Sequence, residues 1–210
     1  MKAVIFDFDG TLANTLPLCF YAFQHVFKKY DQADYAPKDI VAMFGPSETG
    51  IIELNLMHPD KAGAIDLYYE LYESEHDQYV QPIQMIEKML QNLKDKGYKL
   101  GIYTGKARKS LDISLKALNI GDYFDAAVTG DDVSCPKPDP EGLLNVLKIL
   151  NVPANETIYV GDSEGDIMAG KAAGMGTVGV QWMPTYQSAV FPVKPDHMAD
   201  SFQSFLDWMD

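Results

Sequence analysis

The stretch VIFDFDGT, residues 4–11, places an apolar run directly before two aspartates and a Gly-Thr turn. The apolar residues predict a buried strand, and the turn would hold the carboxylates of Asp7 and Asp9 close together at its end. Like charges held close repel each other, and removal from water adds a desolvation cost. We therefore expect a divalent cation to compensate these two carboxylates.

Short apolar and β-branched runs recur along the chain, and helical patterns lie between the later ones. The predicted strands are residues 3–8, 99–103, 126–129, 157–160 and 177–180. The predicted helices that alternate with them are residues 83–96, 106–118, 140–150, 163–173 and 200–208. Strands that alternate with helices indicate an α/β fold, in which a Rossmann-like parallel sheet is covered by helices on both faces.

The segment 14–80 interrupts this alternation, because it contains no convincing strand pattern. Its helical patterns predict an inserted α-helical cap after the first strand, and they lie at residues 16–29, 37–44 and 64–79. We therefore expect residues 1–13 and 81–210 to form the Rossmann-like catalytic core and residues 14–80 to form the cap. Packing within the protein, rather than against substrate, is the expected role of three cap tyrosines: Tyr68, Tyr69 and Tyr72.

The composition is that of an ordinary soluble globular protein, with 47% hydrophobic and 22% charged residues among 210. The formal charge of −13 disfavours binding to nucleic acid or to anionic membranes, which depends on clustered lysine and arginine. No apolar run is long enough to cross a bilayer, and no secretory or transit pattern precedes the first strand. The two cysteines form no disulfide or metal-binding pattern. We expect a cytoplasmic protein with reduced thiols, as a monomer or small homo-oligomer.

Four polar clusters fall at the predicted carboxyl ends of strands, where ligands bind in an open α/β sheet. They are residues 7–11 (DFDGT), 103–106 (YTGK), 136–138 (PKP) and 161–166 (GDSEGD). Several carboxylates that converge on one point suit a hard cation with oxygen ligands, and so sparse a set favours Mg²⁺ over Ca²⁺. Each cluster alone also has a structural explanation, because Asp, Ser and Gly favour turns and helix caps.

Together the four clusters contain the groups that phosphoryl transfer requires. A carboxylate can attack phosphorus to form an aspartyl-phosphate, and a second carboxyl group can protonate the leaving oxygen and then activate water. A hydroxyl group and a lysine can bind the phosphoryl oxygens and offset their charge. The sequence therefore predicts a phosphoryl-transfer enzyme with a small phosphorylated substrate.

The order and spacing of the clusters resemble the four motifs of the haloacid dehalogenase-like superfamily, in its phosphatase branch, over essentially the whole chain. The resemblance implies that Asp7 is the nucleophile and Asp9 the general acid/base, while Phe8 offers its backbone carbonyl to magnesium. It also implies a cis peptide bond at Lys137–Pro138. The resemblance assigns Thr104 and Lys137 to the phosphoryl group, and Gly105 and Lys106 beside Thr104 are further candidate substrate-binding residues. The resemblance also implies that Asp162 binds the metal and that Asp166 supports it, directly or through water. The candidate metal-binding acids are Asp7, Asp9, Asp162 and Asp166.

An acid at position 9 distinguishes between branches of this superfamily, because an alkoxide leaving group needs a proton and a halide does not. Asp9 therefore favours phosphate esters or anhydrides, and dehalogenase activity is not expected. Two alternatives remain open. A phosphosugar mutase would use the same clusters but return the phosphoryl group to its substrate. A non-catalytic metabolite-binding module would use the fold without turnover.

The predicted cap contains residues 44–50 (FGPSETG), which resemble the substrate-specificity loop of phosphoglycolate phosphatase-like proteins. Ser47 and Thr49 are candidates to contact the leaving group, and a plain turn at a helix start is the alternative explanation. Lys106 either binds an anion at a helix N-terminus or belongs to a solvated face. Arg108 is the only arginine in the chain and lies outside the cap, which counts against a leaving group with a carboxylate or second phosphate.

Overall fold

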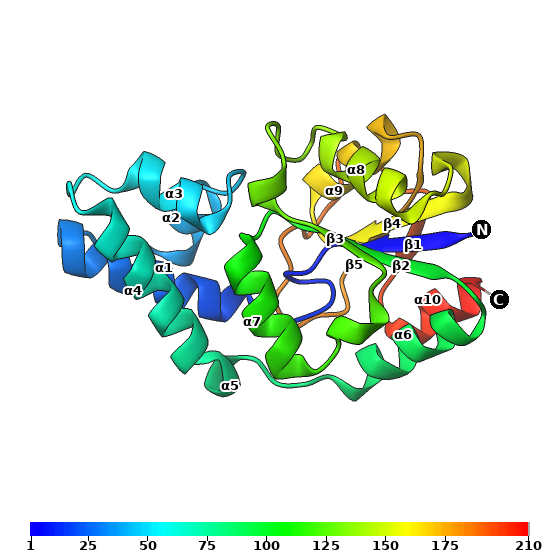
Figure 1. Cartoon of the computed structure of the whole chain (residues 1–210), viewed down its shortest axis with the longest axis horizontal. Coiled ribbons are helices and arrows are strands. Elements are labelled where there is room, and N and C mark those ends of the chain that lie inside the picture. The colour runs from blue at the N-terminus through cyan, green and yellow to red at the C-terminus, as the bar shows by residue number, and fades with distance from the viewer. Residues whose placement is uncertain (210) are drawn as a thin grey trace.

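Figure 1 shows the computed structural model of the protein, which describes residues 1–209 as a parallel sheet with flanking helices and an adjoining group of helices. The strands are β1 (Ala3–Phe6), β2 (Lys99–Tyr103), β3 (Ala126–Val128), β4 (Thr157–Gly161), β5 (Gly176–Val180) and β6 (His197–Ala199). Within residues 1–209 they form one six-stranded sheet in the order β3-β2-β1-β4-β5-β6, and every neighbouring pair is parallel. The predicted α/β fold with a Rossmann-like parallel sheet is confirmed.

Helices cover both faces of this sheet. On one face lie α8 (Glu141–Leu150) and α9 (Glu164–Ala172), and on the other lie α6 (Gln84–Asp95), α7 (Arg108–Leu118) and α10 (Phe202–Met209). Side chains of β1 alternate between the layers, because Ile5 joins the apolar cluster of α8 whereas Phe6 contacts Phe205 of α10, with ring centroids 6.2 Å apart. Short 3-10 turns lie at η1 (Gly121–Tyr123), η2 (Gly130–Asp132) and η3 (Ala154–Glu156).

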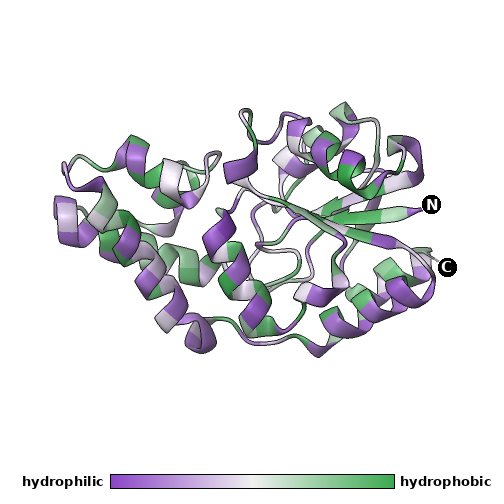
Figure 2. Cartoon of the chain, in the orientation of Figure 1, coloured by the Kyte–Doolittle hydropathy of each residue, from purple (hydrophilic) through white to green (hydrophobic). Residues whose placement is uncertain are grey.

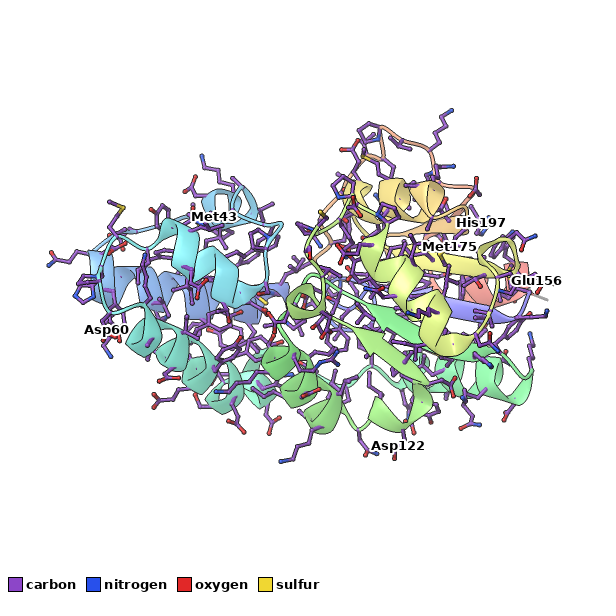
Figure 3. All side chains as sticks on the ribbon, turned by 45° about the horizontal axis from the view of Figure 1, so that its top comes forward. Met43, Asp60, Asp122, Glu156, Met175 and His197 are labelled. Atoms are coloured by element: carbon purple, nitrogen blue, oxygen red, sulfur yellow. The ribbon has the colours of Figure 1, made fainter. Side chains whose placement is uncertain are left out.

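Hydrophobic residues concentrate in the centre of the sheet. Figure 2 shows the central strands as mostly hydrophobic, whereas the surrounding helices carry both hydrophobic and hydrophilic residues. All four residues of β1 are buried, as expected for a strand covered on both faces. In Figure 3, Met43 and Asp60 lie in the adjoining helical group, and Glu156 and His197 lie at the far end of the sheet. Among residues 1–209, no helix has the length and apolar character needed to cross a membrane.

The helical group occupies the left of Figure 1. It contains α1 (Leu16–Asp31), α2 (Pro37–Val41), α3 (Glu48–Asn55), α4 (Lys61–Ser74) and α5 (His76–Tyr79). Helices α1 and α4 form its centre, where the ring of Phe23 lies 4.6 Å from that of Tyr68. Tyr68, Tyr69 and Tyr72 are all buried, so the predicted packing role of these tyrosines is confirmed.

The observed elements differ from the predicted ones chiefly at three places, and the predicted helix 37–44 also ends earlier, at Val41. The predicted helix 64–79 divides near Glu75 into α4 and α5. Helix α3 begins at Glu48, inside the segment 44–50, for which the sequence predicts no more than a turn at a helix start. No sequence pattern predicts β6, because its residues, His-Met-Ala, include no β-branched side chain. This strand forms by pairing with β5, and local periodicity carries no information about that contact.

Helix α7 connects the sheet to the helical group. The Oγ atom of Ser114 in α7 lies 2.8 Å from the hydroxyl of Tyr72 in α4 and 3.0 Å from Nε2 of His76 in α5. All three side chains are buried. Burial lowers the pKa of His76, because removal from water disfavours the charged imidazolium.

We expect His76 to lower the thermal stability of the protein as the pH falls below about 6.5. Unfolding returns His76 to its ordinary pKa, so below this pH the imidazole of His76 is protonated more fully in the unfolded chain than in the folded one. The raised pKa values of Asp7 and Asp162 act in the opposite direction, so the contribution of His76 is taken from the difference between variant and parent. Melting temperatures measured across the neutral and mildly acidic range test this expectation. His76→Gln should flatten the acidic side of the profile, whereas His25→Gln, at an exposed position, should leave it unchanged. An unaltered profile in the His76 variant would contradict this role.

Candidate active site

Three carboxylates meet at the carboxyl ends of β1 and β4. Asp7 follows β1 directly, and its backbone N–H donates to the carbonyl of Val160 at 2.8 Å. Asp162 and Asp166 come from the turn after β4 and the first turn of α9. One oxygen from each carboxylate lies within 4.8 Å of the other two, and all three residues are buried. Gly10 permits this approach, because its φ is +80° and a Cβ there would overlap the carboxylate of Asp162.

This acidic cluster is costly without a cation. Burial, together with Asp166 and Asp9, raises the pKa of Asp7 to about 7 against the opposing effect of Lys137. Burial and the charge of Asp7 raise the pKa of Asp162 well above its ordinary value. Within residues 1–209, the buried Oδ1 atom of Asp162 has no hydrogen-bond partner. A hard divalent cation such as Mg²⁺, which takes carboxylate oxygens as ligands, fits this arrangement.

Asp9 lies outside the three-carboxylate cluster. Its Oδ1 atom accepts a hydrogen bond from Thr15 and lies 3.2 Å from Nζ of Lys106. The carbonyl of Phe8 accepts the backbone N–H groups of residues 11–13, so the turn after β1 uses the oxygen that the resemblance assigns to magnesium. The structure thus brings together three of the four acids proposed as metal ligands, and it places the Asp9 carboxylate apart from them, against Lys106.

Lys137 lies against the acidic cluster. Its Nζ atom is 3.0 Å from Oδ1 of Asp7 and 2.7 Å from Oδ1 of Asp166. The Nζ atom also donates to the hydroxyl of Tyr159 at 3.3 Å, and that hydroxyl lies 2.8 Å from Asp166. Burial opposes the charged form, but Asp166 and Asp7 outweigh this effect and raise the pKa of Lys137. The peptide bond Lys137–Pro138 is cis, as the sequence resemblance implies.

A cavity of about 230 Å³ opens between the sheet and the helical group. Thr104 and Gly105, at the end of β2, line it together with Asp7. The Oγ1 atom of Thr104 accepts the backbone N–H of Lys106 at 3.3 Å. The polar residues that line the cavity from the sheet side are Asp7, Asp9, Thr104, Lys106, Lys137, Ser163 and Gln187. The apolar side chains that line it from the helical group include Leu16, Cys19, Phe23, Phe44 and Ile51.

The first turn of α3 contributes a different cavity residue from the two predicted. Among residues 1–209, the lining of this cavity includes Glu48 and neither Ser47 nor Thr49. The Oγ1 atom of Thr49 instead shares a hydrogen bond with the hydroxyl of Tyr69 at 2.9 Å, within the helical group. Successive side chains of a helix are rotated by about 100° from one another, so adjacent positions face different surroundings.

The sequence patterns give no role at the site to Thr15, Tyr159 or Gln187. The backbone N–H of Gln187, in the loop after β5, donates to Oδ2 of Asp162 at 2.6 Å. Almost every residue type has a backbone N–H, so the identity of residue 187 gives no sequence signal for this contact. Tyr159 fits the pattern of a buried strand, which conceals the polar role of its hydroxyl. For Thr15, the only sequence feature that could suggest a role at the site is its position just after the first motif.

Comparison with known proteins defines the class of this protein. The family of haloacid dehalogenase-like hydrolases matches residues 4–180. The protein therefore belongs to the haloacid dehalogenase-like hydrolases, as its four motifs predict.

Named relatives and solved structures cover nearly the whole chain. Pyrophosphatase PpaX from Bacillus mycoides (strain KBAB4) is 34% identical over 207 residues, which cover 98% of this chain and 95% of that protein. A protein predicted to be a phosphoglycolate phosphatase, from Haemophilus somnus 129PT, shares the fold with a TM-score of 0.86 at 22% identity, over 100% of this chain and 98% of that one. A candidate β-phosphoglucomutase from Thermotoga maritima gives a TM-score of 0.76 at 27% identity, over the same shares.

We expect Mg²⁺ to raise the melting temperature of the protein, because a bound cation offsets the repulsion within the acidic cluster and stabilises the folded state. Asp162→Asn removes one buried charge, so the metal-free variant should melt at a higher temperature and gain little from Mg²⁺. Asp122→Asn, at an exposed carboxyl group, is the matched control. Thermal melts in EDTA and then in Mg²⁺ make the measurement. An equal gain from Mg²⁺ in the Asp162 variant and in the parent would refute this metal site.

Proposed function

We propose that this protein is a Mg²⁺-dependent phosphatase that hydrolyses a small phosphomonoester through an aspartyl-phosphate on Asp7. Membership of the haloacid dehalogenase-like hydrolases supports hydrolysis, and the pyrophosphatase name of its relatives supports a phosphate compound as substrate. One observation carries the proposal. The carboxylate of Asp7 lines a cavity of metabolite size while it contacts Lys137 and lies beside Asp162 and Asp166.

The proposed reaction has two steps. In the first, a carboxylate oxygen of Asp7 attacks phosphorus, the bond from phosphorus to the leaving oxygen breaks, and the carboxyl group of Asp9 gives that oxygen its proton. In the second, the Asp9 carboxylate takes a proton from water, whose oxygen attacks the same phosphorus. The bond from phosphorus to Asp7 then breaks, which releases inorganic phosphate and restores the enzyme. Thr15 and Lys106 hold the Asp9 carboxyl group for both transfers.

Positive charge near Asp7 is essential to this reaction, because the substrate is an anion and the protein has a formal charge of −13. In the proposal, the ammonium group of Lys137 and the hydroxyl of Thr104 bind the phosphoryl oxygens. Mg²⁺ held by Asp7, Asp162 and Asp166 would supply further positive charge to those oxygens.

We further propose that residues 14–80 act as a cap over a core formed by residues 1–13 and 81–210. The sheet side supplies most of the charged side chains of the cavity, and the helical group supplies Glu48 and most of its apolar side chains. Such a cap would exclude bulk water from the phosphoryl group, which strengthens every electrostatic contact within the site.

A phosphosugar mutase is the second candidate, favoured by the likeness to a candidate β-phosphoglucomutase at 27% identity. It would use the same residues but return the phosphoryl group to the substrate instead of to water. Assays of phosphate release on a panel of phosphorylated metabolites separate the two functions. Free phosphate supports the phosphatase, whereas an isomeric product without phosphate supports the mutase.

Asp7→Asn should abolish phosphate release, by a factor on the order of 10⁴ or more, because the nucleophile is lost. The variant should remain folded, since its amide keeps the size of the carboxyl group and removes one buried charge. Intact-mass spectrometry of the quenched parent enzyme should detect one added phosphoryl group, and this adduct should be absent from the variant. Turnover close to the parent rate would refute the mechanism.

Asp9→Asn should slow hydrolysis of an alkyl phosphate by about 10²–10⁴-fold, the usual contribution of general acid–base catalysis. Formation of the phospho-enzyme from p-nitrophenyl phosphate should be affected less, because nitrophenolate leaves without a proton. Rapid-quench measurements of that first step with both substrates test this difference. Equal losses for the two substrates would show that Asp9 does not protonate the leaving group.

A further inference from the structure

Glu48 connects the helical group to the core. It lies in the first turn of α3, is 5% exposed, and accepts hydrogen bonds from the backbone N–H of Ala107 and from Oγ of Ser110, the latter at 2.6 Å. Its Oε1 atom also lies 3.0 Å from Nζ of Lys106. All of these partners belong to the start of α7 or to the turn before it. A buried carboxylate with this many partners occupies a defined position in the cavity wall.

Lys106 is therefore surrounded by negative charge and by an aromatic face. Its ammonium group lies between Asp9 at 3.2 Å and Glu48 at 3.0 Å, and 4.5 Å from the centre of the Tyr72 ring. The residue is 2% exposed, so solvent contributes little to its solvation. Burial opposes the charged form, but Asp9 and the other nearby negative groups outweigh it and raise the pKa of Lys106. This cation has two carboxylate partners before any substrate enters.

The other cations of this part of the protein are also paired. Lys137 contacts Asp7 and Asp166 at the sheet side of the cavity. Arg108, the only arginine in the chain, lies 2.6 Å from Asp132 and outside the cavity lining. Among residues 1–209, the cap side of the cavity thus presents apolar side chains and one carboxylate, that of Glu48, without an unpaired cation.

We propose that Glu48 determines the leaving group that this enzyme accepts, by neutralising Lys106 and so excluding a leaving alcohol that carries a carboxylate or a phosphate. The inference rests on the proposed phosphatase function and specifies its substrate class: a phosphomonoester whose leaving alcohol is uncharged. An anionic leaving group would enter a poorly solvated space beside the Glu48 carboxylate, where repulsion and desolvation both oppose it. An uncharged leaving group would instead contact the apolar wall near Phe23 and Phe44.

Two esters of the same size test this proposal. Phosphoglycolate and 2-hydroxyethyl phosphate differ in one respect, a carboxylate in place of a CH₂OH group at the end of the leaving alcohol. We expect the parent enzyme to prefer 2-hydroxyethyl phosphate by about tenfold or more in kcat/KM, because discrimination by a buried polar site is large. Each ester is also measured as a competitive inhibitor of p-nitrophenyl phosphate hydrolysis, so a slow substrate still gives a binding constant.

Glu48→Gln keeps the shape of the side chain and removes its charge, which leaves Lys106 able to pair with an anion. In this variant, the ratio of kcat/KM for phosphoglycolate to kcat/KM for 2-hydroxyethyl phosphate should rise by about tenfold. Glu53→Gln, which changes an exposed carboxylate on the same helix, should leave this ratio unchanged. Glu48→Asp, which retains the charge, should retain the preference of the parent. For each variant, the two esters are compared as a ratio of kcat/KM values. A general loss of activity lowers both values and leaves the ratio unchanged.

The outcomes distinguish this inference from the proposed function. A parent enzyme that hydrolyses or binds phosphoglycolate as well as 2-hydroxyethyl phosphate would overturn the role of Glu48 while the phosphatase stands. An unshifted ratio in Glu48→Gln would overturn it in the same way. Absence of phosphate release from p-nitrophenyl phosphate and from both esters would instead refute the proposed function itself.

Discussion

The structure depends on compensation of the repulsion and desolvation of three carboxylates, those of Asp7, Asp162 and Asp166, which are buried next to one another. Folded domains are stable by only about 5–15 kcal/mol, so a cluster of like charges must be compensated. Lys137 compensates part of it through its contacts with Asp7 and Asp166. Asp162 keeps a buried oxygen without a hydrogen-bond partner within residues 1–209. This remaining deficit is the physical reason to expect a divalent cation, and it connects the architecture to phosphoryl chemistry.

The parallel sheet makes this cluster possible. Because β1 and β4 are neighbours that run in the same direction, residues far apart in the sequence reach one edge together. Helices on both faces hold the strands in place, so the carboxylates cannot move apart to relieve their repulsion. Gly10 and the turn that follows β1 let Asp162 approach closely.

The helical group adds one carboxylate, that of Glu48, to a second group of charged side chains at the site. The side chain of Glu48 in α3 contacts Lys106, just before the start of α7, and Lys106 in turn contacts Asp9. The group that would donate a proton to the leaving oxygen is thereby connected to the group that faces the leaving alcohol. In the proposed mechanism, proton transfer and selectivity would therefore depend on the same cation, Lys106, so a change at Glu48 would affect both.

Sequence alone determined the fold class, because strand and helix periodicities are local features. The residue types and spacing of the polar clusters also predicted that Asp7, Thr104, Lys137 and Asp162 share one site. The sequence also predicted the cis bond before Pro138 by resemblance. Only the tertiary structure decided that Asp9 pairs with Lys106 apart from the other acids, and that Glu48 rather than Ser47 or Thr49 lines the cavity. Those outcomes depend on which segments meet in space and on how a helix is rotated, and no local pattern encodes either.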